Sequence, residues 1–447
     1  MANYTKAGMD YLLKDWYDKY VPQFNSRTPL LNALKGRKRR VKGGRKVTNS
    51  LELYGSKSAA ARAEGDEFPT STTTVGVPQS IYMKKTVGKW GLSEEAILAA
   101  SGMNDTAFAA VLDKSLTRAA EDMRFDIERQ WAGLGDGVLA VVNVADNGTA
   151  ITAGNSDTIT LNSASTGGYP GNRYLRVGEI LDLYDNAAST AWALQSTAVG
   201  KLEVTAVSSD GTTVTLKNNN SSATVTFATG DVLVREGVRK DGGNSDWDTA
   251  IKEMMGLRGI TDNGTDLGTI HGLSRTTYPA LKGFLNHNSG TLRDFTLPLF
   301  DNTVDGIELQ SGGKVSHAFC NRAMLRVLRK LQTDVRTFDT QKTAMGAAKP
   351  SIATLHGDLT PVEDIFGYPN QITLLSMDDI DLYVLQDIGT WKPDGQTFSR
   401  ATDNTHTRQF VMQYFANLAT SLNCAQGRLD DLNPAYSGDA DVYNLRG

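Results

Sequence analysis

The stretch from residue 62 to residue 131 decides the fold, and it opens with an acidic loop containing glycine and proline, Arg62-Ala63-Glu64-Gly65-Asp66-Glu67-Phe68-Pro69. An alternating segment follows and ends in Leu92-Ser93-Glu94-Glu95. A long helical pattern comes next and stops before Gly133-Leu134-Gly135-Asp136-Gly137. A hairpin that projects from one end of a long helix suits reaching over a neighbouring subunit better than surrounding a substrate.

The helical pattern runs from about Asn104, a candidate N-cap, to Trp131. At a rise of about 1.5 Å per residue, such a helix is roughly 42 Å long. Its apolar face comprises Phe108, Leu112, Leu116, Ala119, Met123, Ile127 and Trp131. Its charged face comprises Lys114, Arg118, Glu121, Asp122, Arg124 and Glu128.

Two segments before the helix, residues 47–54 and 78–90, are expected to be the strands of a hairpin. Neither side of the second strand is purely apolar, which is typical of a thin arm. Residues 55–77 connect them, and a connection of this length is either functional or disordered. Because an isolated two-stranded hairpin is marginal in water, we expect it to become ordered mainly against another subunit.

The first fifty residues form a basic arm, with 12 Lys/Arg against 3 Asp/Glu, whereas the remainder has 34 against 47. A short amphipathic helix is expected at residues 11–20. The densest charge has no apolar face, so we expect an extended run that contacts phosphates, an acidic scaffold or an acidic neighbouring subunit. A solvated basic loop is the alternative, and no helix-turn-helix or finger pattern indicates a sequence-specific DNA reader. The cations are Lys35, Arg37, Lys38, Arg39, Arg40, Lys42, Arg45 and Lys46.

Between residues 143 and 236 the composition changes to Ser, Thr, Asn and Gly with β-branched alternation. Asp210-Gly211 between two alternating runs is a hairpin signature. We expect a small, semi-independent barrel or sandwich inserted into the parent fold, filled by Phe227 and Trp192. A sugar-binding module is the alternative, which sparse aromatic residues disfavour.

After this segment, helices are expected at residues 246–255, 298–309 and 316–337. The last has an apolar side and a cationic side. Four segments are expected to be strands of one mixed sheet: 354–364, 371–376, 382–385 and 407–422.

The sequence contains few motifs that would indicate a catalytic, cofactor-binding or metal-binding site. It has no phosphate-binding loop, dinucleotide fingerprint or nucleophile elbow, and its five histidines lack metal-ligand spacing. We interpret Asp262-Asn263-Gly264-Thr265-Asp266 as a turn and not a calcium loop. No catalytic, cofactor-binding or metal-binding residue is predicted, and the chain is not expected to be an enzyme. Two cysteines and no signal peptide or apolar span indicate a soluble protein of a reducing cytoplasm.

The ordered combination of acidic loop, hairpin and long helix resembles the extended loop and spine helix of major capsid proteins of tailed phages, the Hong Kong 97 type. The resemblance covers roughly residues 47–142 and 237–432. It implies an α+β fold with an N-terminal arm, an extended loop, a spine helix, peripheral and axial domains, and here an inserted small all-β domain. The expected divisions are 1–46 for the basic arm, 47–95 for the extended-loop hairpin, 96–142 for the spine helix and the start of the peripheral domain, 143–236 for the insertion, 237–340 for the peripheral domain, 341–432 for the axial domain and the return to the peripheral domain, and 433–447 for the C-terminal tail.

The resemblance implies a coat protein that forms hexamers and pentamers of an icosahedral head around double-stranded DNA. The expected partners are further copies of the chain, a portal protein, packaged DNA bound non-specifically and, optionally, a decoration protein, with no membrane. A separate scaffolding protein is implied because shell-like sequence begins within about fifty residues of Met1. The location would be the virion capsid, assembled in the cytoplasm of a bacterial host. The intersubunit extended loop would comprise Arg62, Glu64, Gly65, Asp66, Glu67 and Pro69, facing cations such as those of residues 322–336.

Two other functions stay open at this point. An encapsulin-like shell around a protein cargo would share the fold, but it has less need of a cationic N-terminus. A surface adhesion protein with a β module is the other alternative, which the lack of a secretion signal disfavours. No intersubunit crosslink is predicted.

Overall fold

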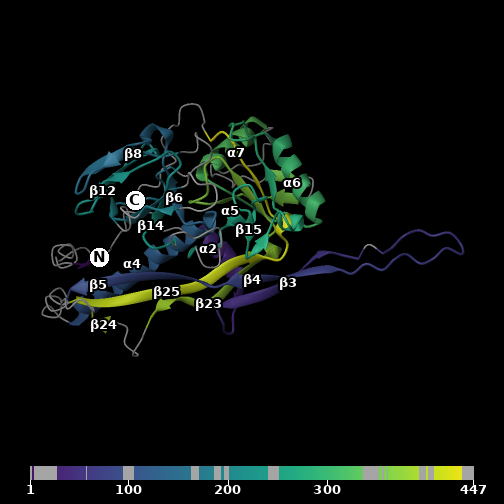
Figure 1. The fold of residues 1–447 in the computed structure, drawn as a ribbon, viewed down its shortest axis with the longest axis horizontal. Coiled ribbons are helices and arrows are strands. Elements are labelled where there is room, and N and C mark those ends of the chain that lie inside the picture. The colour runs from purple at the N-terminus through teal and green to yellow at the C-terminus, as the bar shows by residue number, and fades with distance from the viewer. Residues whose placement is uncertain are drawn as a thin grey trace, which may run out of the picture.

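The computed structural model describes residues 3–4, 28–56, 58–93, 105–162, 171–185, 193–195, 201–239, 251–335, 352–354, 357–359, 361–391, 399–400 and 407–434. Figure 1 shows a body of sheets and helices from which one long hairpin loop projects far to one side. The expected helix at residues 11–20, Trp192 and the first half of the expected helix at 246–255 lie outside the described residues.

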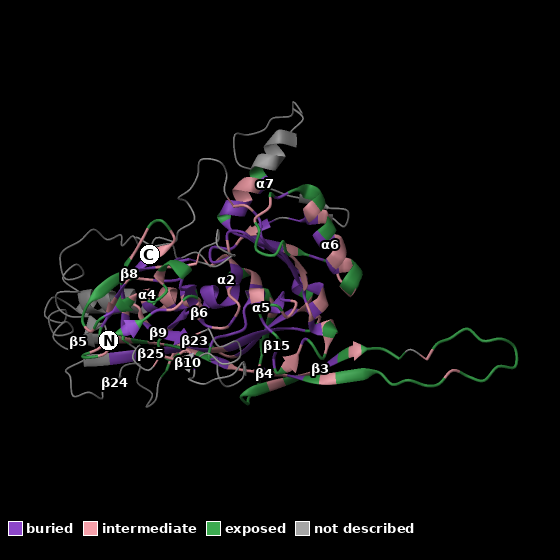
Figure 2. Ribbon diagram, turned by 45° about the horizontal axis from the view of Figure 1, so that its top comes forward, coloured by how far each residue is buried: buried purple, intermediate pink, exposed green. Residues whose placement is uncertain are grey.

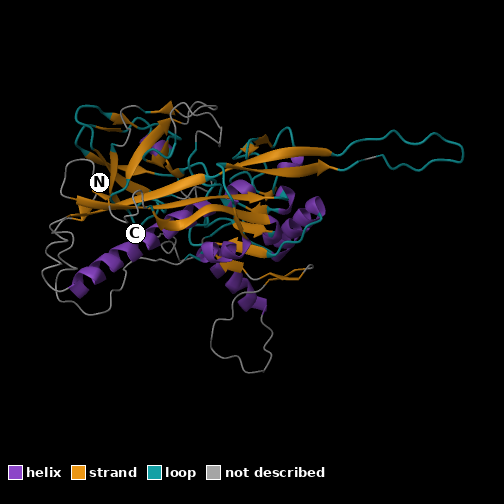
Figure 3. Cartoon of the chain, turned by 90° about the horizontal axis from the view of Figure 1, so that it is seen from below, coloured by secondary structure: helices purple, strands orange, loops and turns teal. Residues whose placement is uncertain are grey.

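One long helix and one six-stranded sheet form the centre of the body. The sheet has the order β1-β5-β25-β23-β2, with β24 paired to β25. Helix α4 (Asp105–Ala132) contacts β5 and β25, and in Figure 3 it is the longest of the purple helices. The strands are β1 (Asn3–Tyr4), β2 (Lys38–Arg40), β5 (Lys84–Ser93), β23 (Ile380–Thr390), β24 (Ser399–Arg400) and β25 (Thr407–Thr420).

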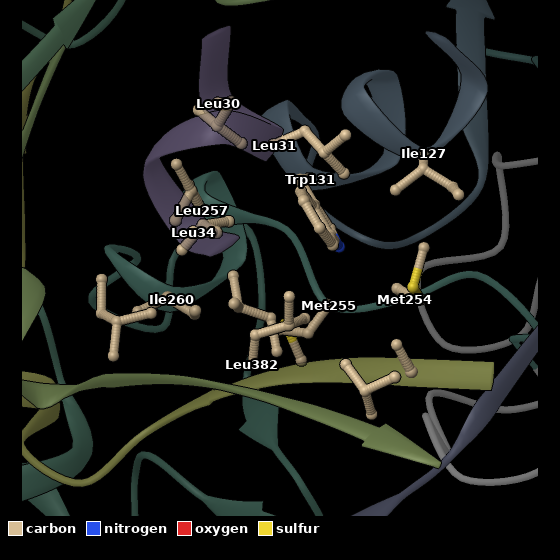
Figure 4. Packing of buried hydrophobic residues seen from close by; sticks show 14 of the residues in the cluster. Leu30, Leu31, Leu34, Ile127, Trp131, Met254, Met255, Leu257, Ile260 and Leu382 are labelled. Carbon is tan, nitrogen blue, oxygen red and sulfur yellow. The ribbon is translucent and has the colours of Figure 1, made fainter. Parts of the chain in front are cut away.

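The expected spine helix is confirmed as α4, and the described part of its apolar face is buried. Ala119, Met123, Ile127 and Trp131 all belong to the main core. In Figure 4, Trp131 lies beside Leu31 of helix α2 (Pro29–Leu34), and Ile127 lies on the side of Met254. The side chains of Phe108, Leu112, Leu116 and Lys114 lie outside the described residues. The prediction was wrong for one residue of the charged face, because Glu128 is fully buried.

Strands β3 (Lys46–Tyr54) and β4 (Val75–Tyr82) form the expected antiparallel hairpin. The prediction of one strand over residues 78–90 was wrong, because Met83 interrupts the strand and separates β4 from β5. Strand β4 pairs with β3, whereas β5 pairs with β25 of the body. The segment therefore divides between the projecting hairpin and the central sheet, so the predicted boundary at 95 does not mark the end of the hairpin.

A second sheet, of order β6-β14-β9-β11-β12-β8 with β10 on β9, lies between residues 138 and 235. The hairpin expected at Asp210-Gly211 is confirmed, since β11 and β12 pair across it and Asp210 accepts hydrogen bonds from the amides of Thr212 and Thr213. Phe227 is buried in its core, as expected. The strands are β6 (Val138–Val141), β8 (Ser156–Thr160), β9 (Ile180–Asp185), β10 (Ala193–Leu194), β11 (Leu202–Val207), β12 (Thr213–Asn218) and β14 (Val232–Arg235), beside the pair β7 (Ala150–Ile151) and β13 (Val225–Thr226).

A third sheet has five strands in the order β17-β26-β22-β18-β21 and is accompanied by helices α6 (Leu297–Ser311) and α7 (Arg322–Val335). The helix expected at 298–309 is confirmed as α6. The helix expected from residue 316 begins six residues later, because residues 317–320 form a buried strand. The strands are β17 (Phe284–Asn286), β18 (His317–Cys320), β21 (Pro361–Glu363), β22 (Ile372–Leu375) and β26 (Gly427–Leu429).

The four segments expected in one mixed sheet belong to different sheets. Strand β22 pairs with β18 and β26, whereas β23 and β25 pair in the central sheet. Strands on both sides of the predicted boundary at 340 pair with each other, so that boundary does not separate two folded units.

Short elements complete the described chain. Residues 251–255 are not helical, and α5 (Leu257–Ile260) follows them. The others are η1 (Lys35–Arg37), η2 (Val144–Asp146), η5 (Pro279–Leu281), η6 (Met377–Asp379), η7 (Asn423–Ala425), and the strand pairs β15 (Thr269–Ile270) with β16 (Leu273–Ser274) and β19 (Ile352–Thr354) with β20 (Gly357–Leu359). Within the described residues, no helix has the length and apolar character required to cross a membrane.

Candidate assembly surfaces

The base of the projecting hairpin is fixed to the body. Ile81 of β4 is fully buried against Tyr383 of the central sheet. The Asn49 side chain donates a hydrogen bond of 2.8 Å to the Tyr383 hydroxyl, and Leu51 belongs to the main core. The hairpin therefore leaves the body in a defined direction.

In the described part of the hairpin tip, residues 55–56 and 58–74, several hydrogen bonds lie within the loop itself. The Ser56 hydroxyl donates to the Thr72 carbonyl at 2.7 Å. At the end of the loop, the Asp66 amide donates to the Ala63 carbonyl and the Asp66 carboxylate accepts from the Ala63 amide. Gly65 has a φ of +86°, which suits glycine in this turn.

Every predicted loop residue lies at this tip. Arg62, Glu64, Gly65, Asp66 and Glu67 are exposed, and Pro69 is half-buried. Figure 2 shows the exposed loop extending well beyond the body. Phe68 stands among them with 96% of its surface exposed, the most exposed of the large apolar residues described.

The basic arm is partly built into the body, which corrects the expectation that it makes only external contacts. Strand β2 pairs in parallel with β23, so that Lys38 lies opposite Leu382. Arg37 and Lys38 form ion pairs with Asp378 and Asp387. The Arg39 guanidinium lies 2.7 Å from the Asp381 carboxylate.

The other cations of the arm face outward. Arg40, Lys42 and Arg45 are exposed and form no ion pair with another described residue. The Lys46 ammonium lies 5.7 Å from the centre of the Tyr82 ring. The side chain of Lys35 lies outside the described residues.

Glu128 joins the arm to the spine helix. Its two carboxylate oxygens accept hydrogen bonds from the amides of Leu30 and Leu31 at 2.6 and 2.7 Å, at the start of α2. These amides have no partner within a helix, so a carboxylate satisfies them well. Burial raises the pKa of Glu128 to about 8, although both amides act in the opposite direction.

A partly buried ionic network joins the inserted sheet to the spine helix. Asp126 accepts from Arg235 of β14 at 2.8 Å and from Arg129 at 3.1 Å, and Arg129 also pairs with Glu253. Burial alone would raise the pKa of Asp126, but the two guanidinium groups hold it far below its usual range. Phe125 and Ala132 of α4 belong to the core of the inserted sheet. The expected semi-independent domain therefore shares its core with the parent fold.

The Asp262-to-Asp266 segment is a turn, as predicted. The Asp262 carboxylate accepts from the amides of Gly264 and Leu267 and lies 3.4 Å from Arg275 and 3.5 Å from Arg428. Both arginines and Asp262 are fully or almost fully buried. Among the described residues, no group of three or more His, Cys, Asp or Glu side chains could hold a metal ion.

A pocket of about 210 Å³ lies between the spine helix, α2 and the central sheet. We name it the spine pocket. Its apolar lining comprises Leu31, Trp131, Leu382, Ile388 and Tyr414. Three exposed charged residues complete it, namely Lys38, Arg124 and Asp387.

A family model described as SU10 major capsid protein matches residues 234–414 of the chain. A chain of the cyanophage A-1(L) capsid asymmetric unit has a TM-score of 0.52 at 11% identity, with 94% of this chain and 96% of that chain covered. The capsid of a native GTA particle gives 0.44 at 9% identity, covering 97% and 100%. Mycobacterium phage Bobi gives 0.43 at 7% identity, covering 97% and 99%. Among curated proteins, none matches this sequence.

The family match over residues 234–414 supports a major capsid protein of tailed phages, and the cyanophage capsid chain shares the fold of this chain. This chain has the Hong Kong 97 type of fold, as the resemblance in its sequence implied. It is a coat protein that self-assembles into the shell of the phage head, a structural protein and not an enzyme, and it is located in the virion capsid. These findings do not favour the encapsulin-like shell or the adhesion protein.

Some residues of these surfaces could not be assigned from the sequence. Phe68 had a signal, because it is the one aromatic residue in an otherwise polar or small loop. Glu128 had only a weak one, its position next to Ile127 at the edge of the apolar face. The spine pocket combines residues from four distant segments, and no local pattern could have located it.

Proposed function

We propose that this coat protein forms hexamers and pentamers that close into an icosahedral head around double-stranded DNA, and that its extended loop holds neighbouring copies together. The observation that carries the proposal is the hairpin itself. Its base is fixed to the body, whereas the hydrogen bonds of Ser56 and Asp66 in the described part of its tip stay within the loop. A loop of this kind gains little within one chain and much on a second copy.

The loop residues that would contact the neighbour are those predicted from the sequence. Glu64, Asp66 and Glu67 supply negative charge, Arg62 adds a cation, and Gly65 and Pro69 set the turn. An exposed ion pair contributes only about 0.2 to 1 kcal/mol. Repeated in every subunit of a shell, such contacts still favour closure.

The exposed cations of the arm are proposed to contact packaged DNA non-specifically. Arg40, Lys42 and Arg45 form no ion pair with another described residue. Such side chains bind phosphate groups without recognising the base sequence. A separate scaffolding protein, a portal protein and, optionally, a decoration protein complete the proposed set of partners. Assembly would take place in the cytoplasm of a bacterial host.

Deletion of Ser58 to Thr73 tests the role of the loop. The shortened protein should remain soluble, with the circular dichroism and unfolding midpoint of the full chain, and should fail to form shells in negative-stain micrographs. A matched control replaces the same residues with a Gly/Ser segment of equal length, and it should fail as well. Closed particles of normal size from either variant would contradict the proposal.

A further inference from the structure

We propose that Phe68 of each copy inserts into the spine pocket of a neighbouring copy, with the acidic residues beside it facing Lys38 and Arg124. The inference rests on the proposed function, because it names the surface on which the extended loop lies. It adds a specific anchor, a specific receptor and a defined orientation between them.

The anchor is an aromatic side chain that its own chain leaves uncovered. Phe68 is 96% exposed, whereas Phe410, Phe366 and Phe300 of the body are almost fully buried. Exposed aromatic residues are unfavourable in water and are typical anchors of protein interfaces. Figure 1 shows the loop directed away from the body, so a second copy is the natural source of a cover.

The receptor has the size and lining that this side chain needs. The spine pocket has a volume of about 210 Å³, and buried Trp131, Leu382 and Tyr414 are among the residues that line it. An apolar cavity of about 150 Å³ is sufficient to hold benzene. A phenylalanine ring therefore fits with room for its attachment to the loop.

The charges of the two surfaces are complementary. Three acids and one cation surround Phe68, so the loop tip is negative. The pocket has two cations and one acid, and that acid, Asp387, is already paired with Lys38. Arg124 is exposed and has no ion pair with another described residue. Complementary charge favours correct docking and suppresses the wrong partner.

The cationic helix expected from the sequence as the counterpart of the loop is a weaker receptor. Arg322 of α7 already lies 2.5 Å from Glu363, and Arg326 and Arg329 also take part in interactions. The spine pocket combines an apolar lining with Arg124, which forms no ion pair with another described residue, and a loop that carries acids and an aromatic residue requires both.

Photocrosslinking identifies the receptor. Full-length protein carrying p-benzoylphenylalanine at position 68 is assembled from an equal mixture of nitrogen-14 and nitrogen-15 subunits, irradiated and digested. We expect adducts between chains on the peptides that contain Leu31 or Ile388. Adducts between chains at another surface would overturn the spine pocket as receptor while leaving the intersubunit loop intact. Shells with no adduct between chains would contradict both proposals.

Substitutions then test the contribution of each part. Phe68→Ala should raise the protein concentration needed for assembly about tenfold or more, as expected when an interface anchor is truncated. Phe68→Leu should retain most of the assembly, and the control Val144→Ala, at another exposed apolar residue, should leave it unchanged. Equal assembly of Phe68→Ala and the unchanged protein would overturn the anchor.

A charge exchange tests orientation. Glu67→Lys and Arg124→Glu should each weaken assembly several-fold, and the double variant should recover part of that loss. Circular dichroism and thermal unfolding of the unassembled variants show that each one is folded. Additive losses in the double variant would overturn the proposed facing of these two charges.

Discussion

The body of this coat protein and its extended loop differ in whether their side chains find contacts within the same chain. In the body, two buried charged groups have partners within the chain: Asp262 lies between two buried arginines, and Glu128 accepts two backbone amides. In the loop, an aromatic ring and three acids stand in solvent. Contacts within one chain therefore order the body, whereas the proposed function assigns the ordering of the loop to contacts with a second copy.

Two aromatic substitutions give the largest expected difference between these regions. Trp131→Ala removes a fully buried ring at the end of the spine helix and should lower the free energy of unfolding of the unassembled protein by about 3 to 5 kcal/mol. Phe68→Ala should change it by less than about 0.5 kcal/mol, because that ring contacts solvent. Denaturant unfolding of both variants measures the difference. A large destabilisation by Phe68→Ala would break the comparison.

A smaller effect concerns the pH dependence of the body. The pKa of Glu128 is about 8 in the folded chain and 4.5 without burial, so between these values the folded state binds a proton that the unfolded state lacks. Its contribution to stability is complete below pH 4.5 and is lost as pH rises through about 8. The unfolding free energy relative to Glu128→Gln should therefore fall from pH 5 to pH 8. A difference that rises over this range would contradict the assignment.

The smallest effect on stability is expected in the basic arm, where the two regions meet. Replacing Arg40, Lys42 and Arg45 with Gln should leave the unfolding midpoint of the free protein unchanged and lower the proportion of DNA-filled heads. The matched control replaces Arg37, Lys38 and Arg39, whose partners are Asp378, Asp387 and Asp381, and should loosen the arm from the central sheet. Normal yields of filled heads from the first variant would remove the proposed DNA contact.

The sequence predicted local elements better than it predicted their partners. The spine helix and the Asp210-Gly211 hairpin follow from spacing and turn chemistry, which neighbouring residues determine. The break at Met83 and the division of β22 from β23 depend on which distant strand pairs with each segment. The prediction that Glu128 is exposed was wrong for a similar reason, because the burial of this residue depends on α2, nearly a hundred residues away. The acidic loop was located from composition, which also marks Phe68 as its one aromatic residue, but the full exposure of that ring became evident only in the folded chain.

The most direct test of the central claim is hydrogen exchange of residues 58–73 before and after assembly. In the free protein these amides should exchange close to the rate of an unfolded peptide, while those of β25 in the central sheet are protected. In shells the loop amides should become protected, with little change in β25. Equal protection of the loop in both states, or no protection in closed shells, would contradict the account that a second copy completes this loop.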